Sequence, residues 1–373
     1  KPAQIIYPND PNHGCNHSWE VWNKVDYPVY AADEPRFMAE FGWCSLPARS
    51  TLETAIGAEH LQPWDDVLMK HYKSQDGVDK LRRAIADGFT EPSRFKDWHY
   101  VTQVQQARAV GFGLDYWRSL WPRCQGALVW QLNDCWPVTS WAAVDSAGIR
   151  KPMWHAAKRS FEPRLALVLA VSEGYVIRLV NNTDEVWAAR PLVRKISLDG
   201  TTRASWSVPV SVPPQEVAEL PLDISSVYSL VNAQLEAAIC ESDEPYNAPD
   251  QRVLPGELQP GRWLLADEIL VVDADAEHPN PVTRRVVALP DKCLDYVRPA
   301  YDVETVGNRV RVSARSLVRD LLLQPDVVGA SGDAPLVTLL PGESYEWVLD
   351  EEVTGDVGLL DAASVELSAR EIR

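Results

Sequence analysis

The sequence lacks any apolar run approaching the ~18 residues that a helix needs to cross a bilayer. It is also poor in positive charge, since 36 lysines and arginines stand against 53 aspartates and glutamates, which gives a formal net charge of -17. With a pI of about 4.9, such a chain repels nucleic acid and anionic membranes, and a neutral ligand suits it better. We therefore expect a soluble protein that binds neither nucleic acid nor membranes.

Cysteine is scarce as well, and its spacing matches neither a CxxC pair nor a Cys/His metal site. The six residues are Cys15, Cys44, Cys124, Cys135, Cys240 and Cys293. This pattern predicts free thiols in a reducing compartment, and we expect a cytoplasmic location.

Several catalytic and ligand-binding motifs are absent. The sequence contains no GxSxG nucleophile elbow, no GxGxxG fingerprint and no Walker loop. His13 and His17 lie four residues apart, but Pro11 and Gly14 argue against a helix that would present both to one metal ion. The residues therefore give no support to a serine hydrolase, a dinucleotide-dependent enzyme, a P-loop NTPase or a metal site.

Tryptophan, in contrast, is abundant and unevenly distributed. Of the 15 tryptophans, eleven precede Phe161 and four follow it. Because aromatic side chains are apolar anchors and good stacking surfaces, the N-terminal part should hold a site for a flat, partly apolar ligand. At 373 residues the chain is long enough for two or three domains with sizeable cores.

Residues 1–162 alternate short apolar strands with helices, which is the rhythm of a parallel α/β unit. The continuous apolar run at 126–130 predicts a strand covered on both faces. The predicted elements are a strand at 36–41, a helix starting at the capping box Ser50-Thr51-Leu52-Glu53, helices at 63–72, 77–87 and 101–117, and the strand at 126–130.

After Pro163 the pattern changes to an alternation with period two, punctuated by turn sequences. It predicts β-sandwiches, with a short helix at 316–322 as the exception. The Pro- and Gly-bearing stretch 254–261 is the expected boundary between two sandwiches. The predicted domains are therefore 1–162, 163–255 and 256–373.

Two polar groups lie at the ends of predicted strands, Glu40 near the end of the first and the segment 130–134 at the end of the later one. The carboxyl ends of parallel strands meet at one edge of a sheet, so we expect Glu40 and Trp130 to face the same mouth. A carboxylate beside an exposed tryptophan suits a sugar, because the indole stacks on the pyranose and the carboxylate stabilises or attacks the anomeric carbon.

Glycoside hydrolysis normally needs two carboxyl groups, roughly 5 Å apart when configuration is retained. Glu40 is the one strong candidate, and the other carboxyl groups are better explained as surface or hydrogen-bonding residues. These other residues are Glu20, Asp33, Glu34, Asp134 and Asp145. His71 and His155 are best explained as hydrogen-bonded core or surface histidines.

The segments around these strand ends carry specific motifs. FMAEFGWCSLP occupies 37–47, GALVWQLNDCWPVTSW 126–141, VDSAGIRKPMWHAAKRSFEP 144–163 and HSWEVW 17–22. They resemble the nucleophile strand, the last barrel strand with its loop, the exit helix and the His-x-Trp-x-Val-Trp loop of the β-mannosidases of glycoside hydrolase family 2. The resemblance covers the chain up to Pro163, and the β-rich remainder agrees with the family's C-terminal sandwich domains in type and order.

The resemblance implies a retaining exo-β-mannosidase that acts on terminal β-D-mannose of an oligosaccharide or glycan, without a cofactor or metal. Glu40 would be the nucleophile and Trp130 the floor of the mannose subsite. The other implied site residues are His17 and Trp19 in its wall, with Asn133 and Trp136 at its rim.

The chain departs from the family pattern in one decisive respect. The family's acid/base Glu follows an Asn well upstream of the nucleophile strand, and no such Asn-Glu pair occurs here. A complete (β/α)₈ barrel also needs roughly 250 residues, more than the α/β portion offers. We therefore expect a multi-domain α/β plus all-β chain, with part of a TIM barrel followed by two immunoglobulin-like sandwiches, that needs the N-terminal part of the same enzyme for activity.

Two alternatives stay open. The chain could come from another family 2 exo-glycosidase, a β-galactosidase or β-glucuronidase, although QLNDCWP favours a mannosidase. It could also be a non-catalytic carbohydrate-binding or structural module.

Overall fold

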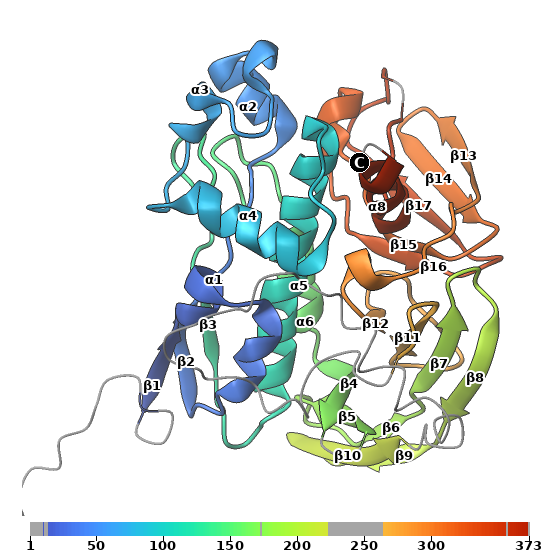
Figure 1. Ribbon diagram of the computed structural model, residues 1–373. Helices are drawn as coiled ribbons and strands as arrows, with labels where there is room; N and C mark the ends of the chain where they lie inside the picture. The colour runs from blue at the N-terminus through green and yellow to red at the C-terminus, as the bar shows by residue number, and fades with distance from the viewer. Residues whose placement is uncertain (1–9, 11–13, 172–173, 223–263, 356, 372–373) are drawn as a thin grey trace, which may run out of the picture.

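The computed structural model describes residues 10, 14–171, 174–222, 264–355 and 357–371. Its N-terminal part combines strands and helices, its C-terminal part is rich in β-sheet, and the long helix α5 runs between the two (Figure 1). No helix among the described residues is long and apolar enough to cross a membrane.

The N-terminal part is built on a three-stranded parallel sheet in the order β1-β2-β3. This confirms the strands expected near 36–41 and 126–130. Its elements are β1 (Cys15–Ser18), α1 (Glu20–Lys24), the 3₁₀ helix η1 (Tyr27–Ala32), β2 (Phe37–Phe41), α2 (Arg49–Ile56), η2 (Ala58–His60), α3 (Asp66–Met69), α4 (Gly77–Gly88), α5 (Phe95–Arg118), β3 (Ala127–Val129) and α6 (Pro152–Ser160).

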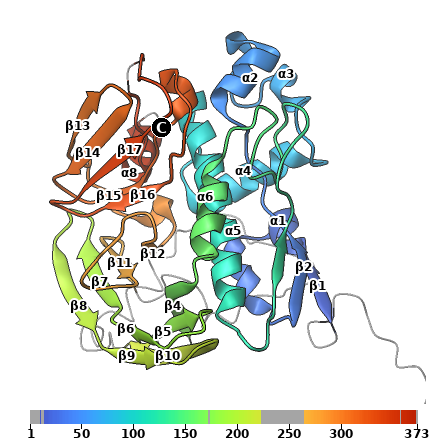
Figure 2. The same cartoon turned by 180° about the vertical axis from the view of Figure 1, so that it is seen from behind.

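Helix α5 is the central element of the N-terminal part. Apolar side chains at Val101, Val104 and Leu114 are fully buried, as their spacing of three or four residues predicts. Helix α6 packs alongside it and faces the β-rich part, as the rear view shows (Figure 2). Helix α5 is buried on nearly every side because the parallel sheet lies on one side of it and the β-rich part on the other.

Three local predictions are wrong. Ser50 lies inside α2 rather than capping it. The N-cap residue is Ala48, which makes no side-chain hydrogen bond to the helix. Residues 316–322 contain the strand β15 (Val318–Leu321) instead of a helix, because this segment pairs with β16 (Val337–Leu339). The strand at 126–130 is not covered on both faces either, since the side chain of Leu128 is 57% exposed.

The C-terminal part contains five antiparallel sheets among the described residues, in the orders β10-β5-β4, β12-β11-β7-β8, β6-β9, β13-β14-β17 and β15-β16. The strands are β4 (Arg164–Val171), β5 (Gly174–Asn181), β6 (Trp187–Ala189), β7 (Leu192–Ser197), β8 (Thr202–Ser207), β9 (Val210–Val212), β10 (Glu216–Leu222), β11 (Glu268–Asp273), β12 (Arg285–Val287), β13 (Tyr301–Val306), β14 (Arg309–Ala314), β15, β16 and β17 (Ser344–Val348), with the 3₁₀ helices η4 (Asp291–Cys293) and η5 (Pro325–Val328).

Among the described residues, the β-rich part has two large separate apolar cores and one small one beside the core that it shares with the helices. One large core includes Val193 and Leu270, and the other includes Val312 and Trp347. The expected boundary at 254–261 lies outside the described residues. Strand β11 follows it in the sequence but pairs with β7, so chain segments on both sides of that stretch share one sheet.

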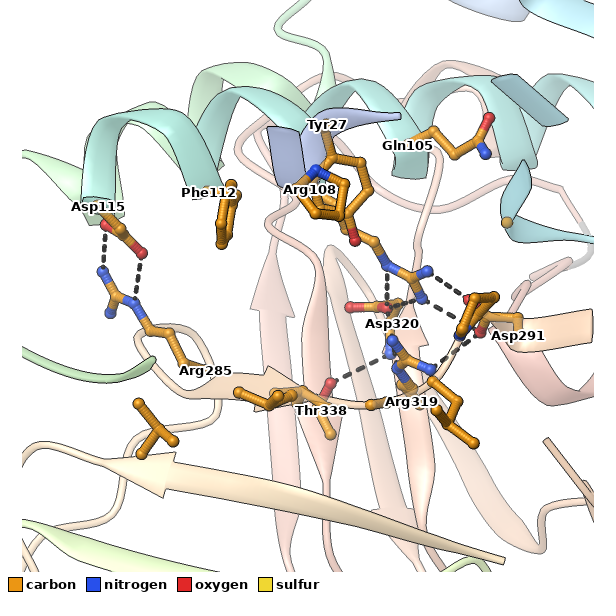
Figure 3. Close-up of a pocket in the computed structure, with 18 of the residues that line it drawn as sticks. Tyr27, Gln105, Arg108, Phe112, Asp115, Arg285, Asp291, Arg319, Asp320 and Thr338 are labelled. Carbon is orange, nitrogen blue, oxygen red and sulfur yellow. Dashed lines mark hydrogen bonds and ion pairs between the residues drawn. The ribbon is translucent and has the colours of Figure 1, made fainter. Parts of the chain in front are cut away.

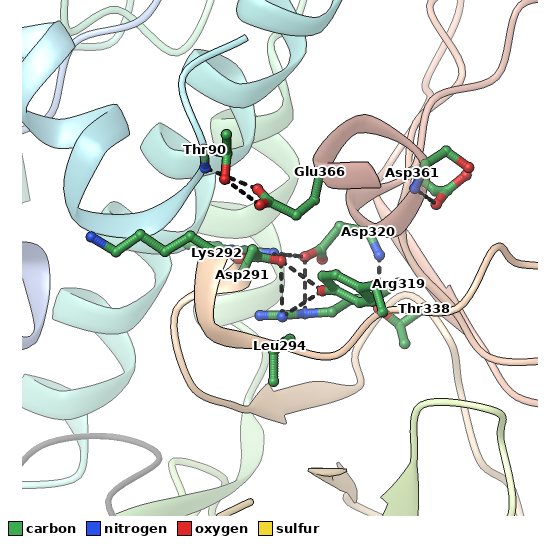
Figure 4. Close-up of polar contacts among 12 residues, drawn as sticks. Thr90, Asp291, Lys292, Leu294, Arg319, Asp320, Thr338, Asp361 and Glu366 are labelled. Carbon is green, nitrogen blue, oxygen red and sulfur yellow. Dashed lines mark hydrogen bonds and ion pairs between the residues drawn. The ribbon is translucent and has the colours of Figure 1, made fainter. Parts of the chain in front are cut away.

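The sequence did not predict the last helix, α8 (Ala362–Glu371), which joins the two parts of the molecule. The buried carboxylate of Glu366 accepts hydrogen bonds from the amide nitrogen of Thr90 at 2.9 Å and from its hydroxyl at 2.5 Å (Figure 4). Nearby, Asp291 of η4 lies in a buried cluster with Arg319 and Asp320. Polar contacts of Glu366 therefore fix α8 against the segment between α4 and α5.

The cysteines correct one further expectation. Cys15, Cys44, Cys124 and Cys135 are free thiols, as predicted. Cys293 is disulfide-bonded, so the prediction of six free thiols is wrong. Cys240 lies outside the described residues.

Candidate active site

A β-bulge decides where the Glu40 side chain points. In the register of β1 with β2, Asn16 is paired with Met38 and His17 with Glu40, so Ala39 is the extra residue. Met38 and Phe41 are both fully buried although they lie three positions apart, and strict alternation would put residues at that spacing on opposite faces. The bulge thus lets the strand keep two core anchors while Glu40 leaves the core and stays partly exposed.

The polar partner of Glu40 comes from the end of β1. The indole nitrogen of Trp19 donates a hydrogen bond to Glu40 Oε2 at 3.0 Å. Trp19 in turn packs edge-on against Trp141, with ring centroids 5.8 Å apart and planes at 76°. Trp19, itself packed against Trp141, therefore orients the carboxylate of Glu40.

The chain after β3 lies directly beside the end of β2, as expected from parallel pairing. The amide nitrogen of Trp130 donates to Phe41 O at 2.8 Å, and the side chain of Trp130 is 43% exposed. A Cβ atom on Gly42 would lie 2.2 Å from Trp130 O, so only glycine permits this approach. The structure thus brings together the two strand ends that carry Glu40 and Trp130.

A second exposed tryptophan lies farther along the same loop. Trp136 is 39% exposed, and its ring is tilted by 42° against His71 at a centroid distance of 5.6 Å. His71 is fixed by a 2.6 Å contact between its Nδ1 and Pro137 O. Asn133, also exposed, donates to Asp134 O at 3.3 Å. These residues form a rim of aromatic and amide groups on the loop after β3.

Asp134 stabilises the loop after β3 through buried polar contacts. It is buried, accepts a hydrogen bond from the Ser140 hydroxyl and forms an ion pair with Lys73 Nζ at 3.3 Å. Its amide nitrogen donates to Val144 O at 3.1 Å. These contacts agree with the interpretation of Asp134 as a hydrogen-bonding residue.

The loop is also tied to the segment that follows Glu40. Ser45 and Ser140 exchange backbone hydrogen bonds of 2.9 and 3.2 Å, and the Ser45 hydroxyl donates to Gln106 Oε1 at 2.6 Å. Lys151 Nζ donates to the same hydroxyl at 3.0 Å. Burial lowers the pKa of Lys151 to about 8. A buried polar network thus holds the two halves of the candidate site in one geometry.

The other carboxylates named from the sequence have structural surroundings. Asp33 accepts from Asn16 Nδ2 at 3.2 Å, and Asp145 accepts from Ala48 N at 3.0 Å. Glu34 lies 3.8 Å from Arg123. Glu20 is exposed at the start of α1.

The other histidines named from the sequence differ in their positions. His155 is buried edge-on against Trp154, and burial lowers its pKa to about 4. His17 lies in β1 opposite Glu40, whereas His13 lies outside the described residues.

In sequence and in fold the chain is similar to glycoside hydrolases. More particularly, it is β-mannosidase-like, which confirms the resemblance inferred from its motifs. A protein named Beta-mannosidase B from Aspergillus flavus is 35% identical over 161 residues, which are 42% of this chain and 19% of that protein. Its namesake from Emericella nidulans is 26% identical over 355 residues, 90% of this chain and 39% of that protein. No protein-family model matches the sequence.

Solved structures give the same result for the fold. A β-D-mannosidase from Dictyoglomus thermophilum superposes on 95% of this chain and 41% of its own, with a TM-score of 0.75 and 21% identity. The exo-chitosanase CsxA from Amycolatopsis orientalis matches 90% of this chain and 44% of its own, with a TM-score of 0.61 and 14% identity. The fold is therefore mixed α/β with many β-sheets, like that of a β-mannosidase. The chain spans less than half the length of these relatives.

Proposed function

We propose that this chain is the C-terminal portion of a retaining exo-β-mannosidase that removes terminal, non-reducing β-D-mannose from oligosaccharides or glycans. In this proposal the parallel sheet belongs to the end of a (β/α)₈ barrel, and the β-rich part forms two immunoglobulin-like sandwiches. The observation that carries it is the position of Glu40, bulged out of β2, held by Trp19 and adjacent to the strand end that bears Trp130.

Each site residue then has a defined task. Glu40 attacks the anomeric carbon and forms a covalent glycosyl-enzyme, which water hydrolyses. The exposed indole of Trp130 stacks on the apolar face of the mannose ring. His17 and Trp19 line the wall of the subsite. Asn133 and Trp136 contact the substrate from the rim.

The proposal also assigns a task to the rest of the enzyme. Departure of the aglycone requires a proton on the glycosidic oxygen, and the general acid that supplies it belongs to the N-terminal part of the same protein. The 373-residue chain by itself should therefore show no turnover of β-mannosides.

Trapping of the covalent intermediate tests the nucleophile. The protein, extended by its upstream coding sequence, is incubated with a 2-deoxy-2-fluoro-β-mannosyl fluoride, digested and analysed by mass spectrometry. We expect the label on Glu40 and a loss of kcat of ~10³-fold or more in Glu40→Gln. Glu20→Gln, at an exposed position of α1, is the matched control and should keep its activity. A label on any other residue contradicts the assignment.

A panel of aryl β-glycosides tests the substrate class. Hydrolysis of the mannoside ahead of the galactoside, glucuronide and glucosaminide supports the proposal. Preference for one of the other sugars would make the protein a different exo-glycosidase, and binding without hydrolysis by the extended protein would indicate a carbohydrate-binding module.

A further inference from the structure

A cavity of about 200 Å³ lies between α5 and the β-rich part, apart from the candidate active site (Figure 3). It is smaller than the roughly 300–1,000 Å³ of sites that bury drug-sized molecules. Its lining mixes apolar side chains, among them Phe112, Leu167 and Leu169, with a high density of charge. Five arginines contribute to that charge: Arg108, Arg159, Arg284, Arg285 and Arg319.

Four of these arginines have carboxylate partners at nitrogen–oxygen distances of 2.5 to 3.6 Å. The pairs are Arg108 and Arg319 with Asp291 and Asp320, Arg284 with Asp273 and Glu343, and Arg285 with Asp115. Asp26 also lines the cavity, and burial together with Asp87 raises its pKa to about 7. Arg83 and Arg108 act in the opposite direction and lower the pKa of Asp26, but they do not outweigh its burial.

Arg159 is the exception among the five. It forms no ion pair with a carboxylate among the described residues, and its Nη1 donates to Arg284 O at 3.3 Å. Its Nε is buried without a hydrogen-bond partner. Burial and the neighbouring Arg285 lower the pKa of Arg159 to about 10. The guanidinium is therefore still charged at neutral pH, in surroundings that disfavour the charge.

The carboxylates that act on Arg159 are already engaged. Asp115 accepts two hydrogen bonds from Arg285, at 3.0 and 3.2 Å, and Asp320 is held by Arg108. The guanidinium also lies close to α5, since its Nη2 is 3.3 Å from the position that a Cβ atom on Gly111 would occupy. Arg159 thus lines the cavity without an ion-pair partner of its own among the described residues.

We propose that this cavity binds a small oxyanion, a carboxylate or a phosphate, through Arg159. A planar guanidinium with free donors is the group that proteins use for both anions, since its fork matches two oxygens at once. An anion would give Arg159 the direct ion-pair partner that no carboxylate among the described residues supplies. Because α5, α6 and the β-rich part meet here, a bound anion would also tie the two parts of the molecule together.

Thermal unfolding of the intact protein tests the proposal. Inorganic phosphate, acetate, benzoate and the neutral benzamide are titrated at constant ionic strength against chloride, and calorimetric titration measures affinity. We expect saturable binding and a raised unfolding midpoint with phosphate or with the carboxylates, and none with benzamide. The compound that binds shows whether the oxyanion is a phosphate or a carboxylate.

Variants connect the effect to this cavity. Arg159→Met should weaken binding by at least about tenfold, and without ligand it should be no less stable than the wild type because a guanidinium without an ion-pair partner is removed. Leu169→Trp fills the cavity, keeps Arg159 and should abolish binding as well. Arg49→Met, at an exposed i,i+4 pair on α2, is the control that leaves binding unchanged. Absence of any stabilising anion, or unchanged binding in both cavity variants, overturns the proposal.

Discussion

The junction between the two β-rich cores depends on one arginine, and its replacement allows a quantitative prediction. The side chain of Arg284 is fully buried and donates to Asp273 at 2.9 and 3.3 Å and to Glu343 at 2.6 and 2.8 Å. It also donates to Thr338 O at 2.7 Å. Removing one partner of a buried ion pair costs about 3–5 kcal/mol. Because Asp273 keeps its pair with Arg194, we expect Arg284→Met to lose about 3 kcal/mol, the lower end of that range.

Urea unfolding, followed by circular dichroism, measures this loss. Arg309→Met is the matched control, since its pair with Glu346 is solvent-exposed and should contribute less than about 1 kcal/mol. Hydrogen bonds from Arg284 outweigh burial and lower the pKa of Glu343, so the wild type loses this stability as the pH falls through the lowered value. Arg284→Met should lose less stability than the wild type on acidification. A loss equal to that of Arg309→Met would refute the reasoning.

Three further predictions follow from buried contacts. Lys151 has a pKa of about 8 in the fold against 10.5 unfolded, so the unfolded state binds more protons between these values and stability rises by up to about 3 kcal/mol across that window. Lys151→Met should lack this rise in unfolding measured from pH 7 to 10.5. Gly42→Ala forces a Cβ to 2.2 Å from Trp130 O and should reduce mannosidase kcat/KM in the extended protein far more than Gly148→Ala, where a Cβ has open space. Glu366→Gln should cost about 1–3 kcal/mol in chemical unfolding, since the buried carboxylate accepts both hydrogen bonds of Thr90, and an unchanged midpoint would contradict it.

The start of α2 shows why local pattern failed in one place. Ser50 and Glu53 have the spacing of a capping box, but the orphan amides are satisfied by residues far away in the sequence. Asp145 accepts from Ala48 N at 3.0 Å, and Asp326 accepts from Ser50 N at 2.9 Å. A cap supplied from a distant segment leaves no signal at the helix itself.

Residues 316–322 show the same limit for secondary structure. Leu317, Leu321 and Leu322 are all buried, which suits one face of a helix as well as a strand between two layers. Pairing with β16 decided the outcome, and Asp320 at a φ of 49° marks the irregularity in that pairing. The apolar content was visible in the sequence, whereas the partner strand was not.

The sequence by itself determined the position of the candidate site. Parallel strands end at a common edge, so two polar strand ends in an apolar context could be placed together without a structure. Glu40 and Trp130 were found in this way, and the four free cysteines and the helix α5 followed from local pattern.

Tertiary structure alone decided the orientation of Glu40 and the ion pairing around Arg159. The bulge in β2 turns Glu40 away from the core, and it arises from pairing with β1 rather than from the residues FMAEF. Arg159 likewise has no ion-pair partner among the described residues, because the nearby carboxylates Asp115 and Asp320 are bound by other arginines. Register and ion pairing join residues that are distant along the chain, so their outcome is fixed only when the whole chain is folded.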